Sequence, residues 1–323
     1  MPPAPTTWVL SDGRAGNERQ ALALARALSP HEPRVWRLET RAPWRQAAPR
    51  KLPGSAEAFG ESFRDALRDP PALAIGCGRQ AALATRLLRE AGARAVQILD
   101  PRIDPRHWDA VVVPEHDALR GANVITSIGG LHAVDADALA RARAAFPQFA
   151  HLSSPRMLLL LGGPVRSVPL DAAWWRRTVD VLRAIQRRDG GSLSLCASPR
   201  TPAWLVDAVR RERFDRDPGP VSGGVVWLTD DDGPNPYPGL LAWAERIVVS
   251  PDSVNMASEA AATGASVAIA EPALACGRHA AFLASLLRLR AAAPLDADAP
   301  FAASTVLREL PRVAALVRER LGW

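Results

Sequence analysis

Short runs of apolar residues alternate with longer amphipathic stretches along the 323-residue chain. Uninterrupted apolar runs bounded by turn residues are typical of strands that are buried on both faces of a parallel sheet. The stretches between them carry the spacing of surface helices, for example at residues 17–28 and 79–91. In the first part of the chain the expected strands are TTWVL, VWRLE, ALAIGCG, AVQIL, AVVVP and NVITSI.

The alternation restarts near residue 150, where Pro147 and Pro155 bracket a break. Strand and helix patterns in two blocks predict an α/β chain of two doubly wound, Rossmann-like domains that face each other across a cleft. The predicted domains are residues 1–150 and 151–323, and the C-terminal helix has the option of packing back on the first. Ligands of such folds bind beyond the carboxyl ends of the strands. The second block has expected strands MLLLLGG, SLSLCAS, VVWLTD, RIVVS and SVAIAEP, and expected helices at 171–188, 202–211, 253–262 and 302–322.

Composition adds a preference for anionic partners. The hydrophobic fraction is 48%, as in soluble globular proteins, but the net charge is +6 and Lys51 is the only lysine. This balance means either a solvated basic surface or binding to small anions, an anionic membrane face or nucleic acid. No nucleic-acid motif or basic cluster interleaved with aromatic residues is present, so nucleic acid is not an expected partner. Arginine forks suit phosphate groups, which favours phosphorylated substrates.

The cysteines and the N-terminus indicate the compartment. Cys77, Cys196 and Cys276 lie far apart and form neither a disulfide framework nor a CxxC metal site. We therefore expect buried free thiols, which suit a reducing cytoplasm. The N-terminus lacks the features of a signal peptide, and the longest apolar runs are too short to span a bilayer. A cytoplasmic protein is the expectation, with peripheral contact to the anionic inner face of the membrane as an option.

The stretch VVSPDSVNMASEAAATGASVAIAEP, residues 248–272, joins an apolar strand to an alanine-rich helix. Asp252 or Ser253 is suited to cap this helix, whose first amides, at 254–256, would then project toward a ligand. Glu259 follows about one turn later, where a carboxylate is able to accept both hydroxyls of a ribose. The combination favours a nucleotide diphosphate at the helix start. The plain alternative is a capped scaffold helix with a solvated glutamate.

The same segment resembles the donor-binding segment of GT-B glycosyltransferases, in which a strand, a short turn and a Ser/Thr-x-Glu helix follow one another. A closer resemblance covers most of the chain and is to the elongated-mitochondria family, named for a plant mitochondrial-fission factor and widespread in bacteria. Two places depart from that family's pattern: residues 198–200 read Ser-Pro-Arg where two arginines usually follow the serine, and 264–266 read Gly-Ala-Ser where Gly-Lys-Pro is usual. The segments that carry the resemblance are SDGRAGNERQALALA, VVVPEHD, NVITSIGGLH, SPRTP, NPYPGLLAWAERIVVSPDSVNMASEAAATG and GRHAAFL.

The resemblance implies that the second block binds a nucleotide-diphosphate sugar. Gly162 and Gly163 end a strand where the backbone is able to approach a phosphate, or they form a simple tight turn. Arg200 is the expected cation for the diphosphate, as a metal-independent transferase requires. Asn235 and Tyr237 form either a loop that closes over the base or sugar, or an ordinary Pro-rich turn. The expected donor-binding set is Gly162, Gly163, Ser198, Arg200, Thr201, Asn235, Tyr237, Ser253, Asn255, Met256 and Glu259.

The resemblance also implies that the first block binds the acceptor. Asp12 is the catalytic candidate, because deprotonation of an acceptor hydroxyl requires a positioned base; the alternative is that Asp12 only orders its turn. Asn17 is suited to cap the following helix. For His116 the alternative is a structural hydrogen bond. The expected acceptor-side set is Gly13, Arg14, Gly16, Asn17, Arg79 and His116.

No metal site is expected, because the histidines lack ligand spacing and the acidic run 230–232 is typical of a solvated turn. No tightly bound cofactor is expected either. The favoured function is a GT-B-like glycosyltransferase that transfers from a nucleotide-diphosphate sugar to an unknown acceptor, in envelope or surface-glycan synthesis. The alternatives are a non-catalytic nucleotide-binding adaptor that recruits a partner to a membrane, and an epimerase or phosphorylase acting on sugar nucleotides.

Overall fold

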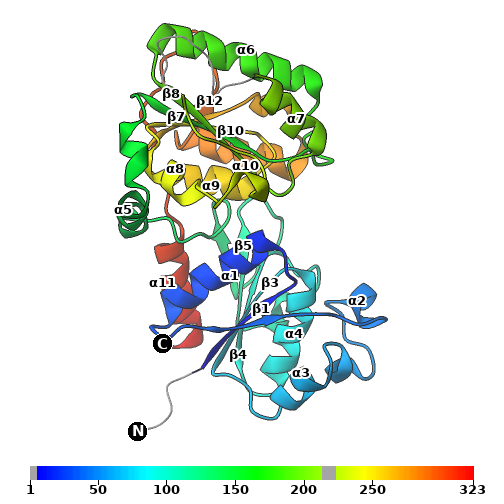
Figure 1. Cartoon of the computed structure of the whole chain (residues 1–323). Helices are drawn as coiled ribbons and strands as arrows, with labels where there is room; N and C mark the ends of the chain where they lie inside the picture. Colours follow the sequence, from blue (N-terminus) through cyan, green and yellow to red (C-terminus); the bar gives the residue numbers. More distant parts are fainter. Residues whose placement is uncertain (1–5, 213–222) are drawn as a thin grey trace. The chain divides into compact units, whose positions relative to one another are not determined.

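The computed structural model describes residues 6–212 and 223–323, which form two compact units. The first unit holds the chain up to Ala133 together with Glu309–Trp323, and the second holds Val134–Arg308. Each unit is built on a parallel six-stranded sheet covered by helices (Figure 1). The α/β, Rossmann-like architecture expected from the alternating pattern is confirmed in both units.

The sheet of the first unit has the strand order β2-β1-β3-β4-β5-β6, and all its strand pairs are parallel. Its strands are β1 (Thr7–Ser11), β2 (Arg34–Arg37), β3 (Leu73–Cys77), β4 (Arg94–Ile98), β5 (Ala110–Pro114) and β6 (Val124–Ser127). Its α-helices are α1 (Ala15–Leu28), α2 (Trp44–Ala47), α3 (Glu61–Ala66), α4 (Arg79–Glu90) and α11 (Leu310–Leu321).

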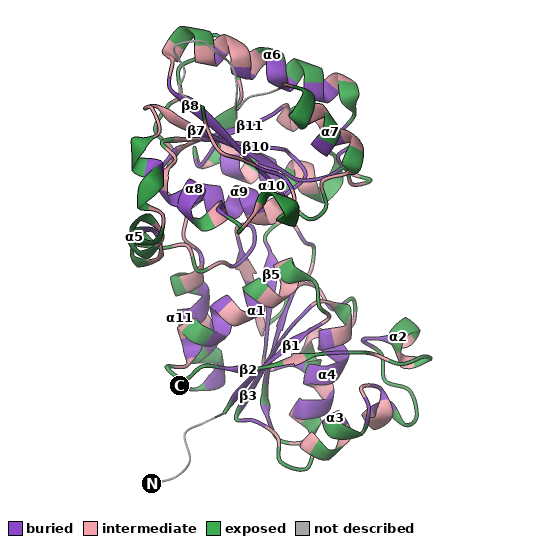
Figure 2. Cartoon of the chain, viewed as in Figure 1, coloured by how far each residue is buried: buried purple, intermediate pink, exposed green. Residues whose placement is uncertain are grey.

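Alternate residues of β1 enter the cores on opposite faces of this sheet, as the period of a strand requires. Val9 belongs to a buried cluster that includes Leu24 of α1 and Val317 of α11. Its neighbour Trp8 belongs to a second cluster that includes Leu83 of α4. Figure 2 shows the central strands buried along their whole length. Burial on both faces explains why the strands are uninterrupted apolar runs, each large side chain contributing about 1.5–3 kcal/mol.

The sheet of the second unit has the order β12-β11-β10-β7-β8-β9, again with parallel pairs throughout. The longest described helix, α6, has 18 residues, and across both described ranges no helix combines the length and apolar character needed to cross a bilayer. The strands are β7 (Arg156–Leu161), β8 (Ser192–Ala197), β9 (Val226–Trp227), β10 (Arg246–Val249), β11 (Ser266–Ile269) and β12 (Ala293–Pro294). The α-helices are α5 (Ala136–Ala145), α6 (Ala172–Asp189), α7 (Ala203–Glu212), α8 (Tyr237–Trp243), α9 (Val254–Ala261) and α10 (Gly277–Arg288).

Residues 134–150, which we expected in the first domain, are part of the second unit. The reason is that α5 packs against α8. Nε of Arg143 donates to the carbonyl oxygen of Ala242 at 2.8 Å. The ring of Phe146 lies so close to Gly239 that an added Cβ would be 2.4 Å from it. Because Gly239 of α8 has no side chain, the ring of Phe146, just after α5, is able to pack closely against that helix.

Helix α11 lies in the first unit, although it is separated from the rest of that unit by the whole second unit in sequence. Arg312 Nη2 donates to the carbonyl oxygen of Thr126 at 2.6 Å. Arg318 donates to the carbonyl oxygen of Ala27 at the end of α1. Together with the apolar contacts of Val317, these bonds attach the C-terminal segment to α1 and β6.

The cysteines are free, but only two of the three are buried. Burial raises the pKa of the Cys77 thiol and raises that of Cys196 to about 12. Cys276 is exposed, so the expectation of a buried thiol is wrong at that position. Its backbone forms the N-cap of α10 at the surface, which the apolar residues around it in sequence did not indicate.

Candidate functional site

The residues expected to bind a donor gather at the carboxyl edge of the second sheet. Strands β10, β7 and β8 are neighbours and run parallel (Figure 1). Gly162, Ser198 and Ser250, which directly follow the last residues of β7, β8 and β10, therefore emerge at the same edge. All of them belong to one unit.

Asp252 is the centre of a buried hydrogen-bond network at this edge, and its side chain is 0% exposed. Its Oδ2 accepts from the backbone N–H of Gly163 at 2.9 Å and from Nη2 of Arg200 at 2.9 Å. Its Oδ1 accepts from the hydroxyl of Ser250 at 2.7 Å, and that hydroxyl accepts from the N–H of Gly162 at 2.8 Å. A buried carboxylate requires such donors to offset the loss of water, so the network fixes three strand ends together.

Gly162 and Gly163 allow this network to close. A Cβ on Gly162 would lie 2.1 Å from Oδ2 of Asp252, and a Cβ on Gly163 would lie 2.0 Å from the carbonyl oxygen of Arg200. Neither distance is compatible with any side chain. The backbone at these glycines was expected to approach a phosphate closely. In the structure it closely approaches the Asp252 carboxylate and the Arg200 backbone.

Ser253, and not Asp252, caps helix α9. Its Oγ accepts from the backbone N–H of Met256 at 3.3 Å, while the Asp252 carboxylate points to the other strand ends. The cap therefore engages one of the three amides expected to face a ligand. The N–H groups of Val254 and Asn255 have no acceptor among the described residues, and they lie at the positive end of the helix.

Glu259 lies further along α9 and is only 8% exposed. The hydroxyl of Tyr237, the first residue of α8, donates to its Oε2. The amide N–H of Tyr237 in turn donates to Oδ1 of Asn235 at 2.9 Å, which fixes the turn before α8. The three residues that the sequence grouped near a base and ribose are thus linked, with Tyr237 orienting the carboxylate.

The turn after β8 holds Ser198, Arg200 and Thr201. The N–H of Ser198 continues the ladder to the carbonyl oxygen of Leu161 at 2.8 Å, and the N–H of Arg200 donates to Oγ of Ser198 at 3.2 Å. The hydroxyl of Thr201 lies 2.7 Å from the carbonyl oxygen of Gly162. Ser198 and Thr201 therefore shape the turn, and the Arg200 side chain, 49% exposed, presents its charge beside Asp252.

Four residues at this edge were not in the expected donor-binding set: Asp252, which was predicted only as a possible cap, and Ser250, Ser167 and His279. Ser250 bridges Gly162 and Asp252, as described above. Nε2 of His279, on α10, donates to the carbonyl oxygen of Asp252 at 3.1 Å, and the hydroxyl of Ser167 is 2.8 Å from its Nδ1. Burial lowers the pKa of His279, which favours the neutral imidazole. Only Ser250, which directly follows an apolar strand, could have been predicted at this edge from local sequence. His279 reaches the edge from α10, which is distant in sequence.

In the first unit, Asp12 follows β1 at the carboxyl edge of its own sheet. Its Oδ1 accepts from Nδ2 of Asn17 at 3.2 Å and from the N–H of Arg14 at 3.3 Å. Gly78, after the neighbouring strand β3, is close to this pair, since an added Cβ would lie 2.7 Å from Nδ2 of Asn17. The prediction that Asn17 caps α1 is wrong: Arg14 is the N-cap residue, and Asn17 lies inside the first turn, where its side chain holds Asp12.

The other acceptor-side residues are more loosely connected. Gly13 has φ of +80°, which favours glycine, and Gly16 lies in the first turn of α1. The Arg14 side chain is 82% exposed, beside Asp12. Arg79 donates to the carbonyl oxygens of Arg45 and Gln46, both at 3.1 Å, and so ties down a loop. His116 follows the end of β5 at the same edge of the sheet.

The acidic run Asp230–Asp232 forms a 3-10 turn. Oδ2 of Asp232 accepts from the N–H groups of Leu228 and Thr229 at 2.8 and 3.0 Å, so this carboxylate closes its own turn. In the part of the chain that the structure describes, no group of three or more His, Cys, Asp or Glu side chains could hold a metal ion.

Two solved structures illustrate the fold. A structure of Methanocaldococcus jannaschii UDP-GlcNAc 2-epimerase in complex with UDP-GlcNAc and UDP is similar with a TM-score of 0.53 at 10% identity, over 98% of this chain and 99% of that one. Acinetobacter baumannii MurG is similar with a TM-score of 0.49 at 16% identity, over 98% and 93%. This chain thus shares its fold with the epimerase.

Sequence relatives give the family. Arabidopsis thaliana mitochondrial fission protein ELM1 is 29% identical over 224 residues, which is 61% of this chain but only 51%, about half, of the plant protein. Protein RP120 of Rickettsia prowazekii (strain Madrid E) is 23% identical over 300 residues, 80% of each chain. The family model Mitochondrial fission ELM1 matches residues 15–321. This chain therefore belongs to the mitochondrial fission ELM1 family.

Proposed function

We propose that the chain is a metal-independent, GT-B-like glycosyltransferase that binds a nucleotide-diphosphate sugar at the carboxyl edge of the second sheet. One observation carries the proposal: a buried network joins Asp252 to Gly163 and Arg200, directly before the Ser253 cap at the start of α9. The similar epimerase was solved with UDP-GlcNAc and UDP, which supports a nucleotide sugar as the ligand class.

The diphosphate would lie between Arg200 and the start of α9. The amides of Val254 and Asn255 are donors with no acceptor in the described chain, and the helix adds partial positive charge there. Arg200 adds a guanidinium group: one of its nitrogens bonds to Asp252, while 49% of the side chain is exposed and able to meet a phosphate. A cation held in this way stabilises the leaving diphosphate without a metal.

The ribose would bond to Glu259. The Tyr237 hydroxyl donates to Oε2 of this carboxylate, and the ribose hydroxyls would donate to the same group. Since Glu259 is 8% exposed, a nucleoside reaches it only over a small area or by exchanging with the tyrosine hydroxyl. Tyr237 would then cover the bound base or sugar, with Asn235 fixing its backbone.

In the proposed reaction an acceptor hydroxyl attacks the anomeric carbon of the sugar. The bond from that carbon to the β-phosphate oxygen breaks, the nucleoside diphosphate leaves with the electron pair, and Asp12 takes the hydroxyl proton. Asn17 and Arg14 hold the Asp12 carboxylate in an orientation that suits a base. No tightly bound cofactor is involved. The proposed setting is envelope or surface-glycan synthesis, with peripheral contact to an anionic membrane.

Ligand-dependent melting tests the donor site. A nucleoside diphosphate or its sugar at about 100 times Kd should raise Tm by about 5 °C or more. Glu259→Gln should weaken nucleoside diphosphate binding about tenfold or more, but leave inorganic pyrophosphate binding unchanged, because only the ribose contact is lost. Arg200→Gln should weaken both. Glu271→Gln, which removes a surface carboxylate of the same unit, is the matched control. No stabilisation by any nucleotide would contradict the proposal.

A nucleotide-binding adaptor is the second candidate, and membership of a family named for mitochondrial fission favours it. The adaptor and the enzyme are expected to bind the same nucleotide. They differ in turnover: an enzyme releases nucleoside diphosphate from the sugar nucleotide, and Asp12→Asn abolishes release while leaving donor affinity intact. Binding without any turnover, together with association with liposomes or a protein partner, would favour the adaptor. Analysis of the product separates transfer from epimerisation or phosphorolysis.

A further inference from the structure

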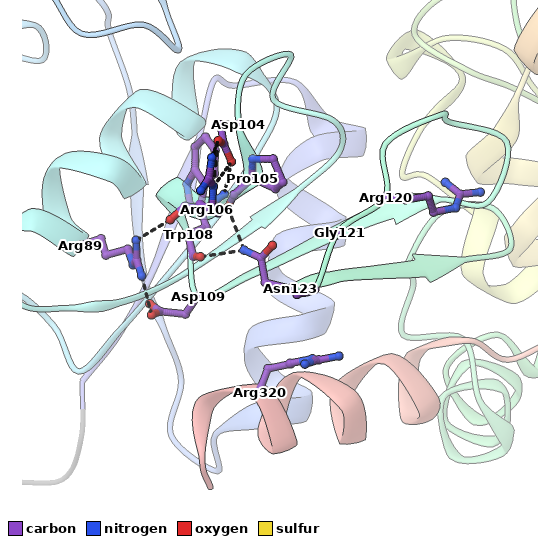
Figure 3. A pocket seen from close by; sticks show the side chains of 11 residues that line it. Arg89, Asp104, Pro105, Arg106, Trp108, Asp109, Arg120, Gly121, Asn123 and Arg320 are labelled. Atoms are coloured by element: carbon purple, nitrogen blue, oxygen red, sulfur yellow. Dashed lines mark hydrogen bonds and ion pairs between the residues drawn. The ribbon is translucent and has the colours of Figure 1, made fainter.

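The first unit contains a cavity of about 710 Å³ that the donor and acceptor assignments do not use (Figure 3). It lies at the amino edge of the sheet, because its walls come from the residues before β5 and β6, the end of α4, and α11. Asp12 lies at the opposite, carboxyl edge. A five-residue strand such as β5 spans about 16 Å, so the two places are separate. Every residue around the cavity belongs to the first unit.

Hydrogen bonds fix the position of the residues that form one wall of the cavity. Nδ2 of Asn123 donates to the carbonyl oxygens of Pro105 and Trp108 at 2.8 and 2.9 Å. Trp108 is 1% exposed, and its Nε1 donates to the hydroxyl of Thr85 at 2.8 Å. The connection before β5 is therefore anchored to β6 and α4. A cavity with such a fixed wall needs little rearrangement to accept a ligand.

The walls carry an excess of arginine from three separate elements: Arg89 of α4, Arg106 of the loop before β5, and Arg320 of α11 (Figure 3). Two carboxylates oppose them. Asp109 holds Arg89 at 3.2 Å, and Asp104 holds Arg106 at 2.7 Å. A fourth arginine, Arg120, also lines the cavity, but its guanidinium donates to the carbonyl oxygens of Asp117 and Glu115 in its own loop and points away from the cavity.

Arg320 is the third of these arginines, and neither Asp104 nor Asp109 forms an ion pair with it. Its side chain is exposed, and within the described ranges no hydrogen bond or ion pair involves its guanidinium. A second cavity of about 440 Å³ shares Arg89 and Asp109 and adds Arg86 and Arg94 against one glutamate. Burial lowers the pKa of the neighbouring His107, which keeps that ring neutral near pH 7. The surface around both cavities is thus net positive.

We propose that this cavity is a second anion site that binds a ligand through a phosphate group. Arginine forks match phosphate oxygens, and the charged residues already positioned by Asp104 and Asp109 form the rim. The volume lies in the range of small-molecule sites and leaves room for an organic part beside the phosphate. That phosphate belongs either to a free small molecule or to a lipid headgroup. The proposal does not depend on the donor site of the second unit.

Titration of the full chain with inorganic pyrophosphate tests the site. Arg320→Glu should weaken binding at this site about tenfold or more, because a charged donor becomes a repelling carboxylate. Arg176→Glu makes the same change of charge on exposed α6 of the second unit, and it should leave binding within about twofold. Arg200→Gln removes the proposed donor-site contribution, and the Arg320-dependent binding should persist in it. Equal affinities for wild type and Arg320→Glu, or equal losses in both Glu variants, would overturn the proposal.

Vesicle flotation separates the two sources. Wild type that floats with phosphatidylcholine vesicles containing phosphatidic acid, but not with phosphatidylcholine alone, identifies a lipid headgroup when Arg320→Glu fails to float and pyrophosphate competes. Pyrophosphate binding that depends on Arg320, without flotation, identifies a soluble phosphate ligand. If neither pyrophosphate binding nor flotation depends on Arg320, the proposal is overturned. Circular dichroism spectra should confirm that both Glu variants are folded.

Discussion

The carboxyl edges of the two parallel sheets carry similar residue types but hold them in different ways. At the edge of the second sheet, Asp252 has a fully buried side chain and bonds to residues from two other strand ends. At the edge of the first sheet, the side chain of Asp12 is 11% exposed and bonds to Arg14 and Asn17 of its own loop. The arginine beside each differs in the same sense, since 49% of the Arg200 side chain is exposed against 82% of Arg14.

The difference shows how far each edge is organised by the fold. A network that joins several strand ends fixes its donors before any ligand arrives, whereas a network within one loop orders only that loop. The proposed division of labour agrees with this contrast, because every nucleotide sugar presents the same diphosphate and ribose, while acceptors vary. Four predictions test this contrast between the two edges.

The largest expected effect is at the two aspartates. Asp252→Asn leaves buried donors at Gly163 and Arg200 without their carboxylate, and should lower the free energy of unfolding by about 3–4 kcal/mol. Asp12→Asn, at a site with only local partners, should cost about 1 kcal/mol or less. Urea unfolding followed by circular dichroism measures both. Equal losses would mean that the second edge is no better organised than the first.

The next effect separates lack of space from backbone conformation. Gly163→Ala forces a Cβ to within 2.0 Å of a carbonyl oxygen and should cost about 2–3 kcal/mol. Gly13→Ala meets nothing within 4 Å but must keep φ of +80°, which should cost about 1–2 kcal/mol. The melting temperatures of the two variants provide the comparison. A Gly163→Ala protein as stable as wild type would show that the strand ends tolerate separation.

A smaller effect depends on pH. Burial, followed by the charges of Arg200 and Arg278, lowers the pKa of His279, against an opposing influence of Asp252. The unfolded chain therefore takes up a proton near the ordinary pKa of 6.5, while the folded chain does not. The stability that neutral His279 contributes is present above that pH and is lost as the pH falls through it. The free energy of unfolding should fall more between pH 7.5 and pH 5.5 in wild type than in His279→Gln; parallel pH dependences of the two proteins would exclude this role.

The smallest effect is expected at the exposed arginine of the first edge. Arg14→Ala removes only a 3.7 Å surface contact with Asp12 and should change stability by less than about 0.5 kcal/mol. If Arg14 serves the proposed acceptor, its loss should instead raise KM for that acceptor. A stability loss as large as that of Asp252→Asn would contradict the description of this edge as locally organised.

Much of this fold could be predicted from local sequence. Apolar runs such as those at 156–161 and 246–249 became central parallel strands, since burial on both faces leaves no polar alternation. Ser253 was one of two predicted caps and is the cap observed. The placement of strand ends at common edges followed from parallel topology alone.

Polar partnerships were harder to predict, and some predictions were wrong. Asn17 looked like a cap and instead holds Asp12, because α1 begins earlier, after Arg14. Ser250 meets Gly162, and His279 meets Asp252, only because β10, β7 and α10 become neighbours in the folded unit. Their choice of partner depends on residues about 25 to 90 positions away, beyond the reach of local patterns.

The alternation of strands and helices, the parallel sheets and the segments that end at their carboxyl edges could all be predicted from the sequence alone. These follow from hydrophobic periodicity, a property of neighbouring residues. The tertiary structure decided that residues 134–150 join the second unit, that α11 returns to the first, and that Asp252 bonds to three donors. It also decided that arginines from three elements gather around one cavity. Such choices depend on which distant groups can be buried together with their hydrogen bonds satisfied, and only the packed chain fixes that.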